Sequence, residues 1–308
     1  MHTLLLPVLF ALASALSNAF ATVLQREETL KVPSATGFRP GLMLDLLRRP
    51  LWLAGIGAVI AAGVCQALAL NTGPLTVVQP IFVLELPLAL IVASLLMRRH
   101  LPRAGWLAVT CVVVGLAVAL AALAPTGNRT QVPMHRWLPA LAVCAGAVVV
   151  LAAVALRRPE GRARAAFLGA ATAISYALTA ALMKSATHTL DDHGVAAFFT
   201  AWQTYAFAVT GGTALFLLEN ALQGGPLVAS QPALTLGDAT VSVALGITLY
   251  EEQVRSGWWL LPQLLGLVLI AVGAIALARV PLTRSLVAAG ESPGTPGPSP
   301  PPAGRQLP

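Results

Sequence analysis

The chain has 308 residues, of which 57% are hydrophobic and 10% are charged. Soluble domains are about 25% charged, so this composition argues against a water-soluble enzyme or a nucleic-acid-binding domain. The net charge is +7, but the charged residues fall in short clusters between long apolar runs. That arrangement is typical of a polytopic membrane protein, whose main partner is the lipid bilayer.

Nine apolar runs are long enough to cross a membrane as helices, so we expect an all-α multi-pass protein. They cover residues 3–24, 51–70, 74–97, 104–124, 137–156, 165–183, 195–222, 228–250 and 258–278. The first run ends in Ala19-Phe20-Ala21, which resembles a signal-peptide cleavage site. No Lys or Arg precedes that run, so a retained helix is favoured and cleavage is the alternative. Residues 281–308 are rich in Pro, Gly and Ser and are predicted to be disordered.

The distribution of basic residues predicts the orientation of the chain in the membrane. With the N-terminus outside, 15 of the 19 Lys and Arg residues fall in inner loops or in the tail. Cytoplasmic loops carry such an excess, which predicts an N-out/C-in protein of the plasma membrane. Arg outnumbers Lys by 17 to 2, which is typical of a GC-rich, bacterial coding sequence.

Two segments of the chain repeat each other at an offset of 152 residues. The pattern Gly-Pro-Leu-x-x-x-Gln-Pro occurs at 73–80 and at 225–232, and nine identities fall within residues 73–107. A weaker match at an offset of 158 aligns Asn18 with Tyr176. The predicted layout is a first repeat at 1–124, a connector at 125–164 and a second repeat at 165–280. Five spans separate the starts of the two repeats, and this odd number inverts the second repeat, as in secondary transporters with a substrate site at the membrane midplane.

These features resemble a known superfamily. The 4 + 1 + 4 layout, the Gln-Ala-Leu-Ala-Leu sequence at 66–70, the repeated Gly-Pro-Leu-x-x-x-Gln-Pro and the Gly-Trp at the next helix starts are similar to drug/metabolite transporters of the EamA type. Nine helices in an N-out/C-in arrangement resemble the NIPA-type magnesium transporter branch. Most members carry two repeats of five helices, and this chain departs from that pattern.

The resemblance implies a secondary transporter that moves a small metabolite or drug-like solute by alternating access, with proton coupling as one mode. Transport of a divalent cation such as Mg²⁺ is the alternative within the superfamily, and a non-transporting membrane scaffold is the alternative outside it. No Walker, dinucleotide-binding, HExxH or GxSxG motif occurs, so neither an enzyme nor a cofactor is expected. A homodimer is one oligomeric state that the sequence leaves open.

Two carboxylates near the middle of apolar runs are the leading candidates for substrate or ion binding. An ionisable group at this depth is costly and therefore suggests a function. Glu85 and Asp238 lie one position apart once the 152-residue offset is applied. Together they could bind a cation, which would make them its metal ligands, or a proton that is coupled to substrate. Local hydrogen bonding to Ser or Thr is the alternative interpretation.

Two glutamine–proline pairs stand at equivalent places in the two repeats. Proline inside a helix frees the carbonyl four residues earlier and can kink the axis, so Pro80 and Pro232 are kink candidates. A freed carbonyl beside the amide of Gln79 or Gln231 would be a polar cavity lining. A proline in the first helical turn, where no hydrogen bond is lost, is an equal alternative.

Weaker candidates lie elsewhere in the predicted helices. The further binding candidates are Gln66, Glu219, Gln203, Trp202, Tyr176 and Asn18. Lys184 is expected to reach the membrane surface along its aliphatic stem. The acidic, His-bearing segment 188–193 is expected to be a solvated outer loop rather than an antechamber for divalent cations. Small residues at 55–63 and at 211–212 are expected to allow close helix packing.

Overall fold

The computed structural model of the protein describes residues 4–30, 50–96, 100–127, 129 and 131–280. These residues form the helices α1 (Leu5–Leu30), α3 (Pro50–Thr72), α4 (Leu75–Ile81), α5 (Glu85–Leu96), α6 (Arg103–Leu123), α7 (Met134–Leu156), α8 (Arg162–Thr200), α9 (Trp202–Gln223), α10 (Leu227–Tyr250) and α11 (Leu260–Arg279), with 3₁₀ turns η2 (Phe82–Leu84) and η3 (Gly257–Trp259). Nine spans in this part of the chain are long and apolar enough to cross a membrane, which confirms the predicted all-α, multi-pass fold. The predicted disordered tail, 281–308, lies outside the described residues.

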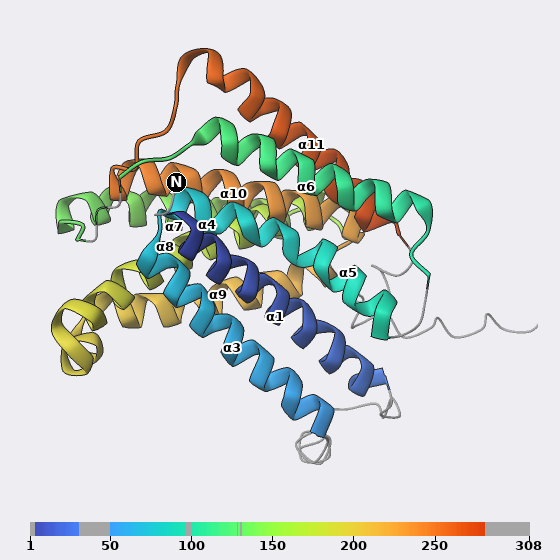
Figure 1. The fold of residues 1–308 in the computed structure, drawn as a ribbon, viewed down its shortest axis with the longest axis horizontal. Helices are drawn as coiled ribbons and strands as arrows, with labels where there is room; N and C mark the ends of the chain where they lie inside the picture. The colour runs from blue at the N-terminus through green and yellow to red at the C-terminus, as the bar shows by residue number, and fades with distance from the viewer. Residues whose placement is uncertain (1–3, 31–49, 97–99, 128, 130, 281–308) are drawn as a thin grey trace, which may run out of the picture.

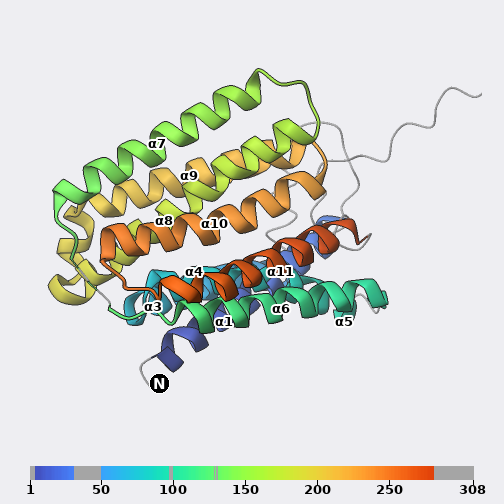
Figure 2. The same ribbon diagram turned by 90° about the horizontal axis from the view of Figure 1, so that it is seen from above.

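The helices form two groups that pack face to face (Figures 1 and 2). Figure 2 shows α7, α8, α9 and α10 on one side and α1, α3, α6 and α11 on the other. Within the groups, α1 packs along α3, α8 along α9 and α10, and α6 along α11. Helix α4 contacts α10 across the two groups. The third and eighth predicted spans therefore meet inside the protein.

The third span is broken in its middle. Helix α4 ends at Ile81, one 3₁₀ turn follows, and α5 begins at Glu85. Pro80 and Pro87 flank this turn, and neither can donate to the carbonyl four residues earlier, so the regular helix is interrupted between them. Pro80 is the sixth residue of α4 and Pro232 the sixth of α10, so neither lies in a first turn, although α10 continues unbroken past Pro232.

Helices α6 and α11 cross at very short range through glycines. A Cβ atom added to Gly115 would lie 2.8 Å from the carbonyl oxygen of Gly266, and one added to Gly266 would lie 2.6 Å from that of Gly115. Close backbone approach between small residues is a common way for membrane helices to associate. The expected small-residue stripe of α3 packs closely only in part. A Cβ atom added to Gly55 would lie 2.8 Å from Gln25 Cγ of α1, whereas one added to Gly57 or Gly63 would have no neighbouring atom within 4 Å.

The expected loop after the sixth span is helical, which corrects the prediction for residues 184–194. Helix α8 runs for 39 residues to Thr200 and is interrupted at Gly194, where φ is 81° and ψ is −178°. No Gly or Pro occurs between Gly169 and Gly194, so nothing in the local sequence ends the helix earlier. The seventh span accordingly begins at Trp202 instead of residue 195.

Candidate functional site

The two predicted carboxylates lie together inside the bundle. Glu85 is the first residue of α5, and its side chain is hydrogen-bonded to Asn18 of α1. Asp238 lies in the middle of α10, where the Ser242 hydroxyl donates to its Oδ1 at 3.4 Å, and it interacts electrostatically with Glu85. Glu85 and Asp238 are both half-buried, so each keeps some surface that a small ligand can contact.

Tyr176 of α8 completes this central polar cluster, which we define as Asn18, Glu85, Tyr176 and Asp238. The Tyr176 phenol interacts electrostatically with Glu85 and Asp238, and also with Glu219 of α9. Tyr176 and Asn18 are half-buried, whereas Glu219 is exposed. The central polar cluster therefore brings together two carboxylates, an amide and a phenol from α1, α5, α8 and α10. Such a set can bind a cation, a proton, or the polar groups of a small solute.

The glutamines before the two prolines have different surroundings. Gln79 of α4 is only 3% exposed, and its Nε2 atom has no hydrogen-bond partner within the described part of the chain. Gln231 of α10 and Gln66 of α3 are half-buried. Leaving a buried amide without a hydrogen-bond partner costs free energy. Of the three glutamines, Gln79 would therefore gain most from a hydrogen bond to a ligand or water.

The candidates at the start of α9 lie away from the central polar cluster. Trp202 packs edge-on against the fully buried Trp137, with ring centroids 5.4 Å apart. Gln203 lines a pocket of about 220 Å³ together with Gln131, Ser185, His188, Thr189 and His193. His188 is 6% exposed and its Nε2 atom has no hydrogen-bond partner among the described residues, so it is not part of a solvated loop. The described residues contain no group of three or more His, Cys, Asp or Glu side chains that could hold a metal ion.

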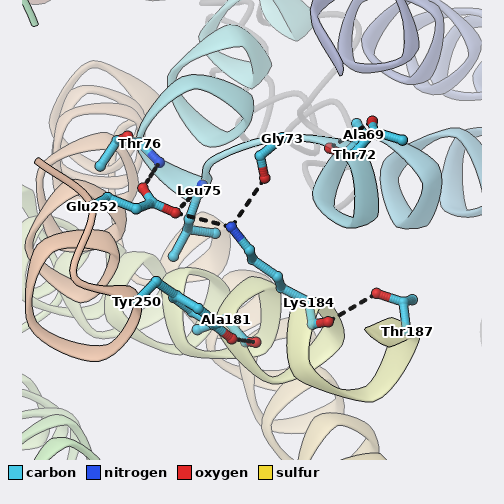
Figure 3. Close-up of polar contacts among 10 residues, drawn as sticks. All are labelled: Ala69, Thr72, Gly73, Leu75, Thr76, Ala181, Lys184, Thr187, Tyr250 and Glu252. Atoms are coloured by element: carbon cyan, nitrogen blue, oxygen red, sulfur yellow. Dashed lines mark hydrogen bonds and ion pairs between the residues drawn. The ribbon is translucent and has the colours of Figure 1, made fainter. Parts of the chain in front are cut away.

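A buried ion pair between Lys184 and Glu252 is a feature that the sequence prediction missed (Figure 3). Both side chains are fully buried, and Lys184 Nζ lies 2.9 Å from Glu252 Oε1. Lys184 therefore does not reach the membrane surface as expected. The backbone N–H groups of Leu75 and Thr76 donate to Oε1 and Oε2 of Glu252 at 2.7 and 2.8 Å, and Lys184 donates to the Gly73 carbonyl at 3.0 Å.

Local geometry positions the Glu252 carboxylate. Helix α10 ends at Tyr250, and Glu251 adopts a left-handed conformation with φ of 51°, which turns the chain back toward α4. A Cβ atom on Gly246 would lie 2.5 Å from Glu252 Oε2, so this glycine leaves room for the carboxylate. The pair Glu251-Glu252 in a short loop was the only sequence feature that could have indicated this buried ion pair. Glu251 does not take part in it and forms exposed ion pairs with Arg129 and Arg136.

Comparisons with known proteins give a family but no activity. The chain is 30% identical over 282 residues to an uncharacterized protein of Corynebacterium glutamicum. The match covers 91% of this chain and 96% of that protein. No family model matches the chain, and no solved structure matches it.

Proposed function

The chain belongs to the same family as this Corynebacterium glutamicum protein, and we propose that it is a secondary transporter of the drug/metabolite type. The proposal includes the inverted 4 + 1 + 4 layout and the N-out/C-in orientation. Equivalent helices have equivalent neighbours, since α1 packs along α3 as α8 packs along α9, and this supports the repeat. The bacterial relative and the distribution of basic residues support a bacterial plasma membrane.

The central polar cluster is the observation that carries the proposal. Its members come in repeat-related pairs, because Asn18 aligns with Tyr176, and Glu85 aligns within one position of Asp238. All four side chains gather between α1, α5, α8 and α10. Ionisable groups within a membrane bundle mark substrate and proton pathways, and transporters of this kind place the site between their repeats.

In this mechanism the solute binds to the central polar cluster while one side of the bundle is open. The Glu85 and Asp238 carboxylates accept hydrogen bonds or a positive charge from the solute, and the Tyr176 phenol donates to it. A carboxylate that takes up a proton when the solute leaves would couple the two movements. The preferred substrate is a small metabolite or drug-like solute with hydrogen-bond donors or a cationic group.

Divalent-cation transport is the second candidate, because two carboxylates interact at the site. Calcium prefers about six to eight oxygen ligands, whereas magnesium usually keeps several waters and is bound through one or two carboxylates. The described residues offer no group of three acidic, His or Cys side chains for such an ion. Two carboxylates are enough for a hydrated Mg²⁺, so the two candidates are separated by the test below.

The first test is ligand-dependent thermal stability of the purified protein, followed by uptake into proteoliposomes. A ligand that binds the folded state alone raises the melting temperature with its concentration. Mg²⁺, other divalent cations and a panel of metabolites and drug-like compounds are compared on the wild type, Glu85→Gln and Asp238→Asn. Glu160→Gln is the matched control, because Glu160 is 79% exposed and lies in the turn before α8.

We expect an organic compound to stabilise the wild type and the control but neither cluster variant, and to be taken up with a dependence on the pH gradient. Stabilisation by Mg²⁺ that disappears in both cluster variants would instead support the cation carrier. A compound that stabilises all four proteins equally and is not transported would contradict a transport site at the central polar cluster.

A further inference from the structure

The amino end of α4 is held by charged groups from a distant part of the chain. Glu252 accepts hydrogen bonds from the first two N–H groups of α4, at Leu75 and Thr76, and Lys184 donates to the carbonyl of Gly73. Helix α4 precedes the connector helix α7, whereas Lys184 and Glu252 follow it. All three hydrogen bonds therefore join the first proposed repeat to the second (Figure 3).

We propose that Lys184 and Glu252 form a charged latch that closes the predicted outer side of the bundle and releases α4 when that side opens. This inference rests on the proposed transport function and assigns the residues that control access to its site. With the N-terminus outside, the carboxyl ends of α3 and α10 and the amino end of α4 all lie at the outer side. The α3–α8 contact at this end is continued by Asn71, which donates to Asp191 at 3.4 Å.

The chemistry of the latch suits a contact that must open repeatedly. Removing two charges from water costs free energy, and their mutual attraction roughly returns it, so a buried pair gains little overall compared with its hydrated state. When α4 leaves, water can hydrate both ions and the exposed N–H groups. Leu75, Val77 and Val78 of α4 also belong to the same buried apolar cluster as Leu249 and Tyr250, so opening must separate part of that cluster as well.

The pair itself stays with the second repeat when α4 leaves. The Lys184 ammonium lies 4.6 Å from the centre of the Tyr250 ring, and the Tyr250 hydroxyl donates to the Ala181 carbonyl at 2.6 Å. Lys184 and Ala181 belong to α8, and Tyr250 is the last residue of α10. These contacts keep Lys184 next to Glu252, so the ion pair itself need not break when α4 leaves.

The latch predicts a characteristic pattern for three variants. Lys184→Met or Glu252→Gln alone leaves one buried charge without its counter-ion in the closed state, and opening lets water hydrate that charge. Each single variant should therefore favour the open state. The double variant Lys184→Met/Glu252→Gln buries no charge, and Gln can still accept a hydrogen bond from α4. We expect the double variant to remain closed.

Double electron–electron resonance, which measures distances between pairs of spin labels attached to introduced cysteines, tests this pattern on the full chain in lipid nanodiscs. In a background without Cys65, Cys111 and Cys144, one label pair is placed at Leu68 of α3 and Leu190 of α8, which are 40% and 38% exposed. A second pair is placed at the opposite ends of the same helices, at Leu51 and Ala163, which are also exposed. Glu251→Gln is the matched control, because it removes the same charge from the neighbouring exposed residue.

In each single variant we expect the ratio of long to short Leu68–Leu190 distances to rise at least about tenfold, with the opposite change for the second pair. The double variant and Glu251→Gln should resemble the wild type. Single variants that melt at a lower temperature without any shift in these distances would overturn the latch and leave a purely structural ion pair.

The same measurement separates the latch from the proposed function. Two arrangements that exchange in the wild type, but whose populations the latch variants do not change, would overturn the latch alone. A single arrangement in the wild type under every condition, including saturation with a stabilising ligand, would contradict alternating access itself. Both label pairs are distant from the central polar cluster, so neither result depends on knowing the substrate.

Discussion

The crossing of α6 and α11 depends on glycine, so Gly266→Ala should destabilise the protein. The added Cβ would lie 2.6 Å from the Gly115 carbonyl oxygen and 2.7 Å from the Ala119 nitrogen. Both are backbone atoms that cannot rotate away, so the helices must move apart by about 1 Å to restore van der Waals contact. Overpacking of this kind costs about 1–3 kcal/mol, and the better helix propensity of Ala returns up to about 1 kcal/mol. We therefore expect Gly266→Ala to lower the free energy of unfolding by about 2 kcal/mol.

The assay is the free energy of unfolding in mixed detergent micelles, titrated with a denaturing detergent. Gly146→Ala in α7 is the control, because no atom lies within 4 Å of the added Cβ. This control gains helix propensity without a clash and should be at least as stable as the wild type. Equal stability of Gly266→Ala and Gly146→Ala would refute the close crossing of α6 and α11.

Three further predictions concern the end of the bundle that contains the latch. Trp137→Ala should lower the unfolding free energy by about 3–5 kcal/mol in the same assay, because Trp137 is fully buried and packs against Trp202. Glu251→Gln should cost about 1 kcal/mol or less, since its ion pairs are exposed, and raising the salt concentration should erase the difference. Gly246→Ala should displace the Glu252 carboxylate and so lengthen the distance between spin labels at Leu68 and Leu190, without changing any charge. An unchanged Leu68–Leu190 distance would contradict the packing described at Gly246.

The number of spans, and the approximate bounds of all but the sixth and seventh, could be predicted from the sequence because each membrane span needs a long apolar run. The meeting of Glu85 and Asp238 could also be predicted, since the 152-residue repeat places them at nearly the same depth. Both predictions rest on patterns that extend over many residues. The break at η2 could not be predicted from Pro80 alone, because Pro232 occupies the equivalent position and is not followed by a change of helix type.

The latch could not be predicted because its partners are far apart in the chain. Lys184 and Glu252 are 68 residues apart, and the α4 N–H groups are a further hundred or more residues away. A lysine at the end of an apolar run is expected at the membrane surface, and only the tertiary structure shows that a carboxylate and a carbonyl surround it. Contacts between residues so far apart leave no periodic pattern in the sequence.

Glycine patterns were equally ambiguous. In the run of small residues at 55–63, Gly55 lies close to α1, yet Gly57 and Gly63 face open space. Gly115 and Gly266 lie in apolar helices with one other glycine each, and they bring α6 and α11 into backbone contact. A small residue permits close approach but does not specify a partner, so the sequence could not identify which helices would meet.

The central polar cluster is symmetric in sequence but asymmetric in structure. Glu85 begins a helix after a break and has a side-chain amide from α1 as its partner, whereas Asp238 lies within a continuous helix and is hydrogen-bonded to the Ser242 hydroxyl of its own helix. The 3₁₀ turn separates Glu85 from α4, whereas no such break separates Asp238 from the rest of α10. The two carboxylates should consequently not be interchangeable, even though the repeat relates them.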